Sequence, residues 1–141
     1  MVLVDSSIWI EALRREGRIE EKVGLECLLD EYEAMWCGPI KLEVLGGARQ
    51  QERKRLRGYF DSIPYRSMRD PDWDFAVENY WRLRDAGHTL PFNDVLIGSL
   101  SLRWICRVYA RDRHFEIMRD VLGVRLYRAG YGGKFDPDAG G

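Results

Sequence analysis

Several features that would assign a protein class at once are missing from this sequence. The three cysteines, Cys27, Cys37 and Cys106, are widely spaced and form no C-x-x-C pair, so neither a disulfide scaffold nor a structural zinc site is expected. No apolar run approaches the roughly 18 residues that a membrane span requires. The first residues contain no basic leader, and we therefore expect a cytoplasmic protein with reduced thiols.

Net charge is almost absent as well, because 23 acidic and 22 basic side chains nearly cancel over 141 residues. This balance excludes a histone-like protein that binds nucleic acid through uniform positive charge. It conceals an alternation, however: residues 1–40 and 70–100 are rich in acids, whereas residues 41–69 and 101–128 are rich in bases. Binding of nucleic acid by a locally basic region is therefore compatible with the sequence.

The apolar content predicts one globular α/β domain. Hydrophobic residues make up 45% of the chain, which is enough for a single core. Short apolar runs predict strands of a mostly parallel sheet at 2–4, 35–37, 64–68 and 108–110, with an edge strand at 124–127. Helical periodicity predicts the intervening helices at 6–13, 19–34, 39–45, 48–60, 70–86, 91–102 and 115–122. This alternation of strands and helices is typical of an α/β fold.

Local features refine this arrangement. Ser6 or Ser7 is expected to cap the first helix. The helix at 91–102 is apolar on nearly all sides, so it should be central and buried. The domain is expected to span residues 1–128, because residues 129–141 are rich in glycine and predict a flexible tail.

Four acidic residues stand where a functional site is expected. Asp5 follows the first predicted strand and Asp112 follows the fourth, so both should lie at the edge of the sheet where ligands bind. Glu43 and Asp94 are isolated acids on otherwise apolar helices, where an unpaired charge is costly. If the four share one site, their repulsion requires a cation, and oxygen ligands favour Mg²⁺ or Mn²⁺.

Each acid also has a purely structural interpretation. Asp5 and Asp112 could each cap a helix. Glu43 could pair with a neighbouring cation, and Asp94 could complement the dipole of its helix. Their joint occurrence is what indicates a metal-dependent enzyme, because a carboxylate-held Mg²⁺ that orients water and neutralises phosphate charge is typical of phosphodiester hydrolysis.

Segments around these acids resemble the four signature blocks of PIN-domain ribonucleases, in particular the VapC toxins of toxin–antitoxin systems: VLVDSSIWIEALR, PIKLEVLGGAR, PFNDVLIGSLSL and VYARDRHF. The order and spacing of the blocks agree over about residues 1–128. The resemblance implies a three-layer α/β/α sandwich with a central, mostly parallel sheet. It also implies an endoribonuclease that uses Mg²⁺ or Mn²⁺ to direct water at RNA, leaving a 5′-phosphate and a 3′-hydroxyl.

The resemblance assigns roles to individual residues by position. Asp5, Asp94 and Asp112 are implied to ligate the metal directly or through water. Glu43 is implied to complete the catalytic site and to position or deprotonate the nucleophilic water. Ser6 matches the small hydroxyl residue that helps to order this water.

Two positions depart from the pattern of the family. Ala110 stands two residues before the last acid, where the family often has Thr or Ser. His114 stands two residues after that acid, where the family often repeats an acid. Both departures weaken a second metal position, so one well-bound ion is expected. A surface or helix-capping role is expected for His114 rather than metal ligation.

Basic side chains near two of the acids could hold phosphates beside the scissile bond. They are Arg49, Arg53, Lys54, Arg55 and Arg57 after Glu43, and Arg111 and Arg113 beside Asp112. The first group could equally be a solvated helix face. The resemblance also implies a cognate antitoxin that covers the active-site face, and a homodimer. Some of the five tryptophans could line a groove for a protein partner.

Two alternatives from other classes stay open. A receiver-like phosphoacceptor module also binds Mg²⁺ with acids at strand ends, but it requires an adjacent acidic pair where this chain has Ser6 and Ser7. A haloacid-dehalogenase-like phosphatase is disfavoured in the same way, because its D-x-D start is absent. A catalytically weak PIN-like module would act through protein partners alone.

Overall fold

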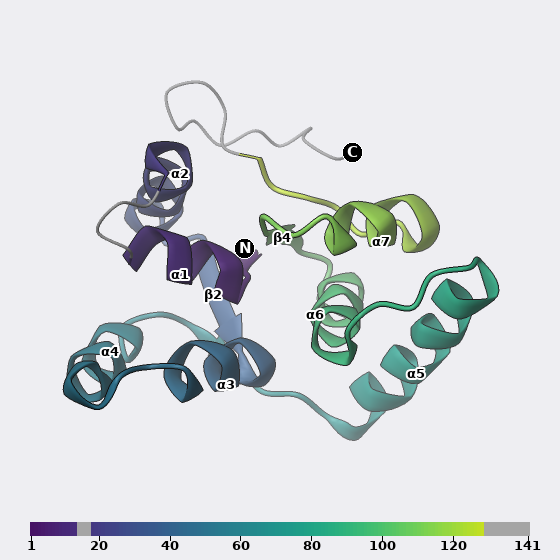
Figure 1. Cartoon of the computed structure of the whole chain (residues 1–141), viewed down its shortest axis with the longest axis horizontal. Helices are drawn as coiled ribbons and strands as arrows, with labels where there is room; N and C mark the ends of the chain where they lie inside the picture. The colour runs from purple at the N-terminus through teal and green to yellow at the C-terminus, as the bar shows by residue number, and fades with distance from the viewer. Residues whose placement is uncertain (14–17, 129–141) are drawn as a thin grey trace.

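The computed structural model describes residues 1–13 and 18–128, so the predicted flexible tail at 129–141 lies outside the described residues. Strands and helices alternate along this part of the chain (Figure 1). The strands are β1 (Val2–Val4), β2 (Ala34–Cys37), β3 (Tyr65–Arg66) and β4 (Arg107–Tyr109). The helices are α1 (Ser6–Leu13), α2 (Ile19–Asp30), α3 (Gly38–Gly46), the 3-10 helix η1 (Gln50–Glu52), α4 (Arg53–Phe60), α5 (Asp70–Asp85), α6 (Phe92–Arg103) and α7 (His114–Leu122).

The strands form one parallel sheet in the order β3-β2-β1-β4. Strand β1 is central, and its three apolar residues are all buried, as expected of a strand covered on both faces. Helix α1 packs on α2 and α3, whereas α5 packs on α6 and α7, so the sheet separates two helical layers (Figure 1). This arrangement confirms the predicted α/β/α sandwich. Because all strands run in one direction, their carboxyl ends meet at a single edge.

Aromatic rings from α1, β2 and α4 build the core on one side of the sheet. Trp9 packs edge-on against Phe60 with ring centroids 4.8 Å apart, and Phe60 stacks on Trp36 at 4.5 Å. Each indole N–H is satisfied by a carbonyl: Trp9 donates to Val4 at 2.9 Å and Trp36 donates to Ile63 at 3.2 Å. The bond from Trp9 ties the first turn of α1 to the end of β1, which holds the strand–helix junction in place.

Helix α6 is the centre of the opposite layer, as its all-round apolar sequence predicts. Its residues from Val95 to Ser101 are all buried. Gly98 allows α7 to approach closely, because a Cβ at this position would lie 2.6 Å from the sulfur of Met118. Helix α5 is tied to α6 by a buried hydrogen bond from Asn79 to Ser99 at 3.0 Å. Helix α6 is therefore held by α7 at Gly98 and by α5 at Ser99.

Two predicted boundaries are wrong for reasons that the backbone shows. The helix predicted at 19–34 ends at Asp30, because Tyr32 adopts a positive φ of 56° and Ala34 already belongs to β2. The helix predicted at 48–60 is divided into η1 and α4. The first helix gives up its last residues to the turn before β2, and the second begins with a single 3-10 turn.

The edge strand predicted at 124–127 is reduced to one paired residue. This segment forms a single parallel bridge, between Leu126 and Val108. Alternation would place Tyr127 on the outside, but its ring is buried and packs edge-on against Tyr109 with centroids 4.8 Å apart. The segment therefore pairs with β4 at one residue of the sheet edge and closes the core beside it.

The cysteines and the apolar segments can be compared with the expectations of no disulfide scaffold and no membrane span. The three cysteines are free thiols. Among residues 1–13 and 18–128, no helix is both long and apolar enough to cross a membrane. The core of the domain is therefore held together by packing and hydrogen bonds without covalent cross-links.

The close approach of α6 and α7 predicts a large effect of a side chain at position 98. We expect Gly98→Val to lower the free energy of unfolding by about 2–3 kcal/mol, because its methyl groups displace Met118 from a packed core. The matched control is Gly58→Val in α4, where a Cβ meets nothing within 4 Å, and it should change stability by less than about 0.5 kcal/mol. Urea unfolding measures both variants, and equal stabilities would contradict the close packing at Gly98.

Candidate active site

Asp5 stands where strand β1 passes directly into helix α1. Its N–H donates to the carbonyl of Tyr109 at 2.9 Å, and its own carbonyl accepts from Ile8 at 3.0 Å. Its Oδ2 accepts the N–H and the hydroxyl of Ser7 at 3.1 and 2.7 Å. Asp5 is therefore the cap of α1, and the prediction that Ser6 or Ser7 caps this helix is wrong.

The second carboxylate oxygen of Asp5 is buried without a partner. Among the described residues nothing forms a hydrogen bond with Oδ1, and the residue is only 3% exposed. Burial raises the pKa of Asp5 to about 6; the bonds from Ser7 lower this pKa, and the charges of Asp94 and Glu43 raise it. A buried carboxylate oxygen without a hydrogen bond is unfavourable by itself. Its position fits a bound cation.

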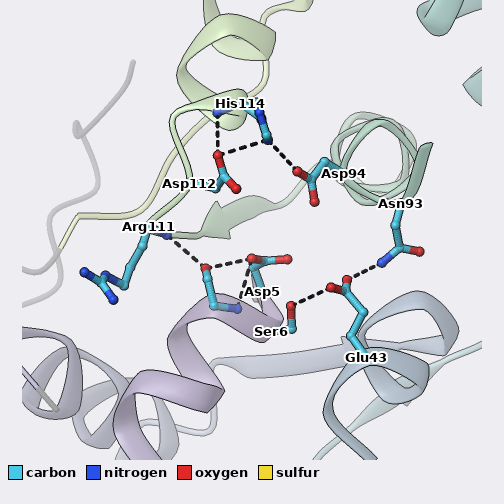
Figure 2. A network of polar contacts seen from close by, with 9 residues as sticks. Asp5, Ser6, Glu43, Asn93, Asp94, Arg111, Asp112 and His114 are labelled. Carbon is cyan, nitrogen blue, oxygen red and sulfur yellow. Dashed lines mark hydrogen bonds and ion pairs between the residues drawn. The ribbon is translucent and has the colours of Figure 1, made fainter. Parts of the chain in front are cut away.

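Glu43 extends from the exposed face of α3, so the cost expected for an unpaired charge on an apolar helix does not apply to this residue. Its Oε2 accepts the hydroxyl of Ser6 at 3.1 Å, and its Oε1 accepts a side-chain N–H of Asn93. These bonds from α1 and α6 direct the carboxylate toward Asp5 and Asp94 (Figure 2). Sequence reasoning did not identify Asn93. The available signal was its position directly before Asp94 at the start of a helix.

Asp94 in the first turn of α6 and Asp112 after β4 lie on either side of the ring of His114 (Figure 2). The Nδ1 of His114 is 2.8 Å from Oδ2 of Asp94 and 3.0 Å from Oδ1 of Asp112. Burial raises the pKa of Asp94; the hydrogen bond with His114 lowers this pKa, and the charge of Asp112 raises it. His114 therefore belongs to the acidic cluster. The surface or capping role expected from the sequence did not predict these contacts.

The four predicted acids converge at the carboxyl edge of the sheet. Together with His114 they form two groups that share Asp94: Asp5, Glu43 and Asp94, and Asp94, Asp112 and His114. In each group, one ligand atom from every residue lies within 4.8 Å of the others. Asp5 and Asp112 belong to different groups, so the cluster is elongated with Asp94 at its middle. Carboxylates this close together repel one another, and a divalent cation relieves the repulsion.

Arg111 supports the site from the protein surface, where it is held by two acidic side chains. Its guanidinium pairs with Glu11 at 2.7 Å and with Glu21 at 3.2 Å. Its backbone N–H donates to the hydroxyl of Ser7 at 3.1 Å, and this hydroxyl in turn holds Asp5. The sequence interpretation of Arg111 as a phosphate ligand is therefore not supported, because two carboxylates already neutralise its charge.

No protein-family model matches the chain, but curated relatives do. The VapC ribonuclease of Mycobacterium bovis and ribonuclease VapC11 of Mycobacterium tuberculosis are each 32% identical to it over 130 residues, covering 89% of this chain and 96% of the relative. The match extends over nearly the whole length of both proteins.

Solved structures share the fold at lower identity. FitAcB from Neisseria gonorrhoeae has a TM-score of 0.71 at 17% identity, covering 86% of this chain and 94% of that chain. VapBC2 from Rickettsia felis, bound to a DNA fragment from its promoter, has a TM-score of 0.74 at 15% identity, covering 89% and 97%. The fold and the sequence relatives agree, and the chain belongs to the VapC ribonuclease family.

Proposed function

We propose that this chain is an endoribonuclease, dependent on Mg²⁺ or Mn²⁺, that hydrolyses RNA phosphodiester bonds as the toxin of a toxin–antitoxin pair. The observation that carries the proposal is the convergence of four carboxylates in two groups that share Asp94, one of which contains the buried Oδ1 of Asp5 that has no hydrogen-bond partner among the described residues. The names of the curated relatives support ribonuclease activity. Solved structures with a similar fold include toxin–antitoxin complexes, which supports the assignment as a toxin.

Asp5, Asp94 and Asp112 are the proposed metal ligands, directly or through water. Ser7 holds one oxygen of Asp5, so the buried second oxygen is already oriented before any ion binds. The oxygen-only set of Asp5, Glu43 and Asp94 suits a hard cation. When bound, such an ion activates water and neutralises the charge that develops on the phosphate.

Glu43 is the proposed group that positions or deprotonates the nucleophilic water. It is exposed, so both water and substrate can reach it. The hydroxyl of Ser6 lies 3.1 Å from Oε2 of Glu43, close enough for both side chains to bind one water molecule. Asn93 holds the other oxygen of Glu43 and limits the directions that this carboxylate can take.

RNA is proposed to approach over exposed basic side chains on both sides of the acidic cluster. Arg113 is exposed beside Asp112, whereas Arg111 is neutralised by Glu11 and Glu21. The larger group is exposed along η1 and α4 and consists of Arg49, Arg53, Lys54, Arg55 and Arg57. Phosphate contacts of this kind release counterions, so binding should weaken steeply as the salt concentration rises.

The assignment as a toxin also implies a protein partner and a location. We propose a cognate antitoxin that covers the active-site face, and a cytoplasmic location. A homodimer is supported by an apolar groove of about 370 Å³ between α5 and α6, which includes Trp73, Tyr80 and Phe92. Residues 1–128 would form the nuclease domain.

Removal of the charge of Asp5 or Asp94 should nearly abolish cleavage of RNA. We expect Asp5→Asn and Asp94→Asn to lower the rate by about a thousandfold, because the charge that holds the ion is lost. Asp85→Asn, at an exposed position at the end of α5, is the matched control and should cleave normally. The measurement is Mg²⁺- or Mn²⁺-dependent cleavage by purified, antitoxin-free protein.

The possible outcomes distinguish a ribonuclease from a PIN-like module without catalytic activity. Undiminished cleavage by both variants would falsify the assignment of the site. Absence of cleavage by the wild-type protein, together with tight antitoxin binding and no metal uptake, would favour a PIN-like module that acts only through partners.

Asp5 should make the stability of the metal-free protein depend on pH. Its folded pKa of about 6 exceeds the ordinary value of 3.8, so the folded state binds the proton more tightly and ionisation destabilises it as the pH rises between these values. In EDTA we expect Asp5→Asn to stabilise the protein by about 2–3 kcal/mol at about pH 8 and to have no effect below about pH 4.

Urea unfolding at several pH values measures this effect, with Asp85→Asn as the control. Addition of Mg²⁺ at about pH 8 should stabilise the wild-type protein and leave Asp5→Asn nearly unchanged. Equal stabilisation of both proteins by the ion would show that Asp5 does not bind it.

Ser6 and Asn93 should act through Glu43. We expect Ser6→Ala and Asn93→Ala each to lower kcat by about tenfold or more with little change in Tm, because Glu43 loses one of its two supports. In a Glu43→Gln background, either substitution should have almost no further effect, because residues that act as a unit are not additive. Full additivity of the kcat effects in this double-mutant cycle would mean that the two side chains act independently of Glu43.

A further inference from the structure

His114 has a place in the acidic cluster to which the proposed function gives no role. It is the first residue of α7, and its Nδ1 lies 2.8 Å from Asp94 and 3.0 Å from Asp112. The side chain of His114 is 31% exposed, whereas that of Asp94 is 14% exposed. A small ion can therefore reach this group from solvent and meet a largely buried carboxylate on its inner side.

The separations around Nδ1 equal those between neighbouring ligands of one ion. In an octahedral site with ligand bonds of about 2.1 Å, adjacent ligand atoms lie about 3.0 Å apart. Without an ion, a proton on Nδ1 gives the same distances as hydrogen bonds to the two carboxylates. The ring can therefore exchange this proton for an ion without a change of rotamer, provided that the remaining ring proton is on Nε2.

An independent observation indicates that a cation belongs in this cluster. Oδ1 of Asp5 is buried with no hydrogen-bond partner among the described residues, and its group shares Asp94 with the group that contains His114. Figure 2 shows the carboxylates of Asp5 and Asp94 and the ring of His114 around the same part of the sheet edge. Asp94 thus lies between an all-oxygen group and a group with one nitrogen.

We propose that His114 is a nitrogen ligand of a divalent ion held together with Asp94 and Asp112, and that this ligand makes the position selective for Mn²⁺ over Mg²⁺. The inference rests on the proposed function, because it requires a divalent ion at the acidic cluster. It differs from the one-ion expectation, in which Asp112 acts as a ligand and His114 does not.

The chemistry of the two ions explains the selectivity. Mg²⁺ prefers oxygen ligands and gives up its water reluctantly. Imidazole nitrogen is a good ligand for first-row transition ions, and Mn²⁺ also accepts carboxylates. Replacement of one carboxylate by an imidazole should therefore cost Mg²⁺ more affinity than Mn²⁺. The family often has an acid at the position of His114, so the restoring variant is His114→Asp.

Pulsed electron paramagnetic resonance of the Mn²⁺-loaded full chain, prepared without a histidine tag, tests the assignment directly. The technique detects a ¹⁴N nucleus bound to Mn²⁺, and the chain contains two histidines in all, His88 and His114. We expect the nitrogen signal in the wild-type protein and in the matched control His88→Gln, and its loss in His114→Gln. If His114→Gln does not fold, the signal in His88→Gln alone assigns the ligand.

Calorimetric titration with each ion supplies the second measurement. We expect the wild-type protein to bind Mn²⁺ at least about tenfold more tightly than Mg²⁺, and His114→Asp to reduce this ratio to near one. A hydrogen-bonding role of His114 alone would leave bound Mn²⁺ without a nitrogen signal, which overturns the inference while metal binding stands. Absence of any Mn²⁺ binding would overturn the metal dependence of the proposed function as well.

Discussion

The junction of β1, α1 and β4 at Asp5 is the constraint on which the rest of the site depends. The N–H of Asp5 donates to Tyr109, its carbonyl accepts from the first turn of α1, and one carboxylate oxygen caps the same helix. Asp5 is therefore held by hydrogen bonds both at its main chain and at one of its carboxylate oxygens. Its other oxygen is directed toward Asp94 and Glu43 (Figure 2). The acids from α3 and α6 therefore face a carboxylate that is held in place by its own strand and helix.

This arrangement gathers negative charge that the surrounding fold must hold together. Burial raises the pKa of both Asp5 and Asp94, which means that the ionised cluster opposes folding near neutral pH. Two well-packed regions compensate: the rings of Trp9, Phe60 and Trp36 behind α1, and the close contact of α6 with α7 at Gly98. Stability given up at a functional site in exchange for activity is a general feature of enzymes.

Local sequence predicted most of the fold and the acids, and it failed where side chains from distant segments interact. The uniformly apolar run at 2–4 and the isolated Asp94 had clear interpretations, because burial and charge are visible residue by residue. The burial of Tyr127 was not predicted, since the residue packs against Tyr109 from a distant strand. Arg111 was misjudged for the same reason, because Glu11 and Glu21 neutralise it from other helices.

The sequence by itself determined the order of strands and helices along the chain and the candidate acids, because these follow from apolar periodicity and from the types of residue present; an oxygen-bound cation is an expectation from those residue types. Tertiary structure alone decided how the acids divide into two groups around Asp94, and that Asn93 supports Glu43 while His114 joins Asp112. These groupings and contacts depend on distances between residues that lie in separate helices and strands. They depend on the parallel order of the strands and on the packing of α6, which no single segment encodes.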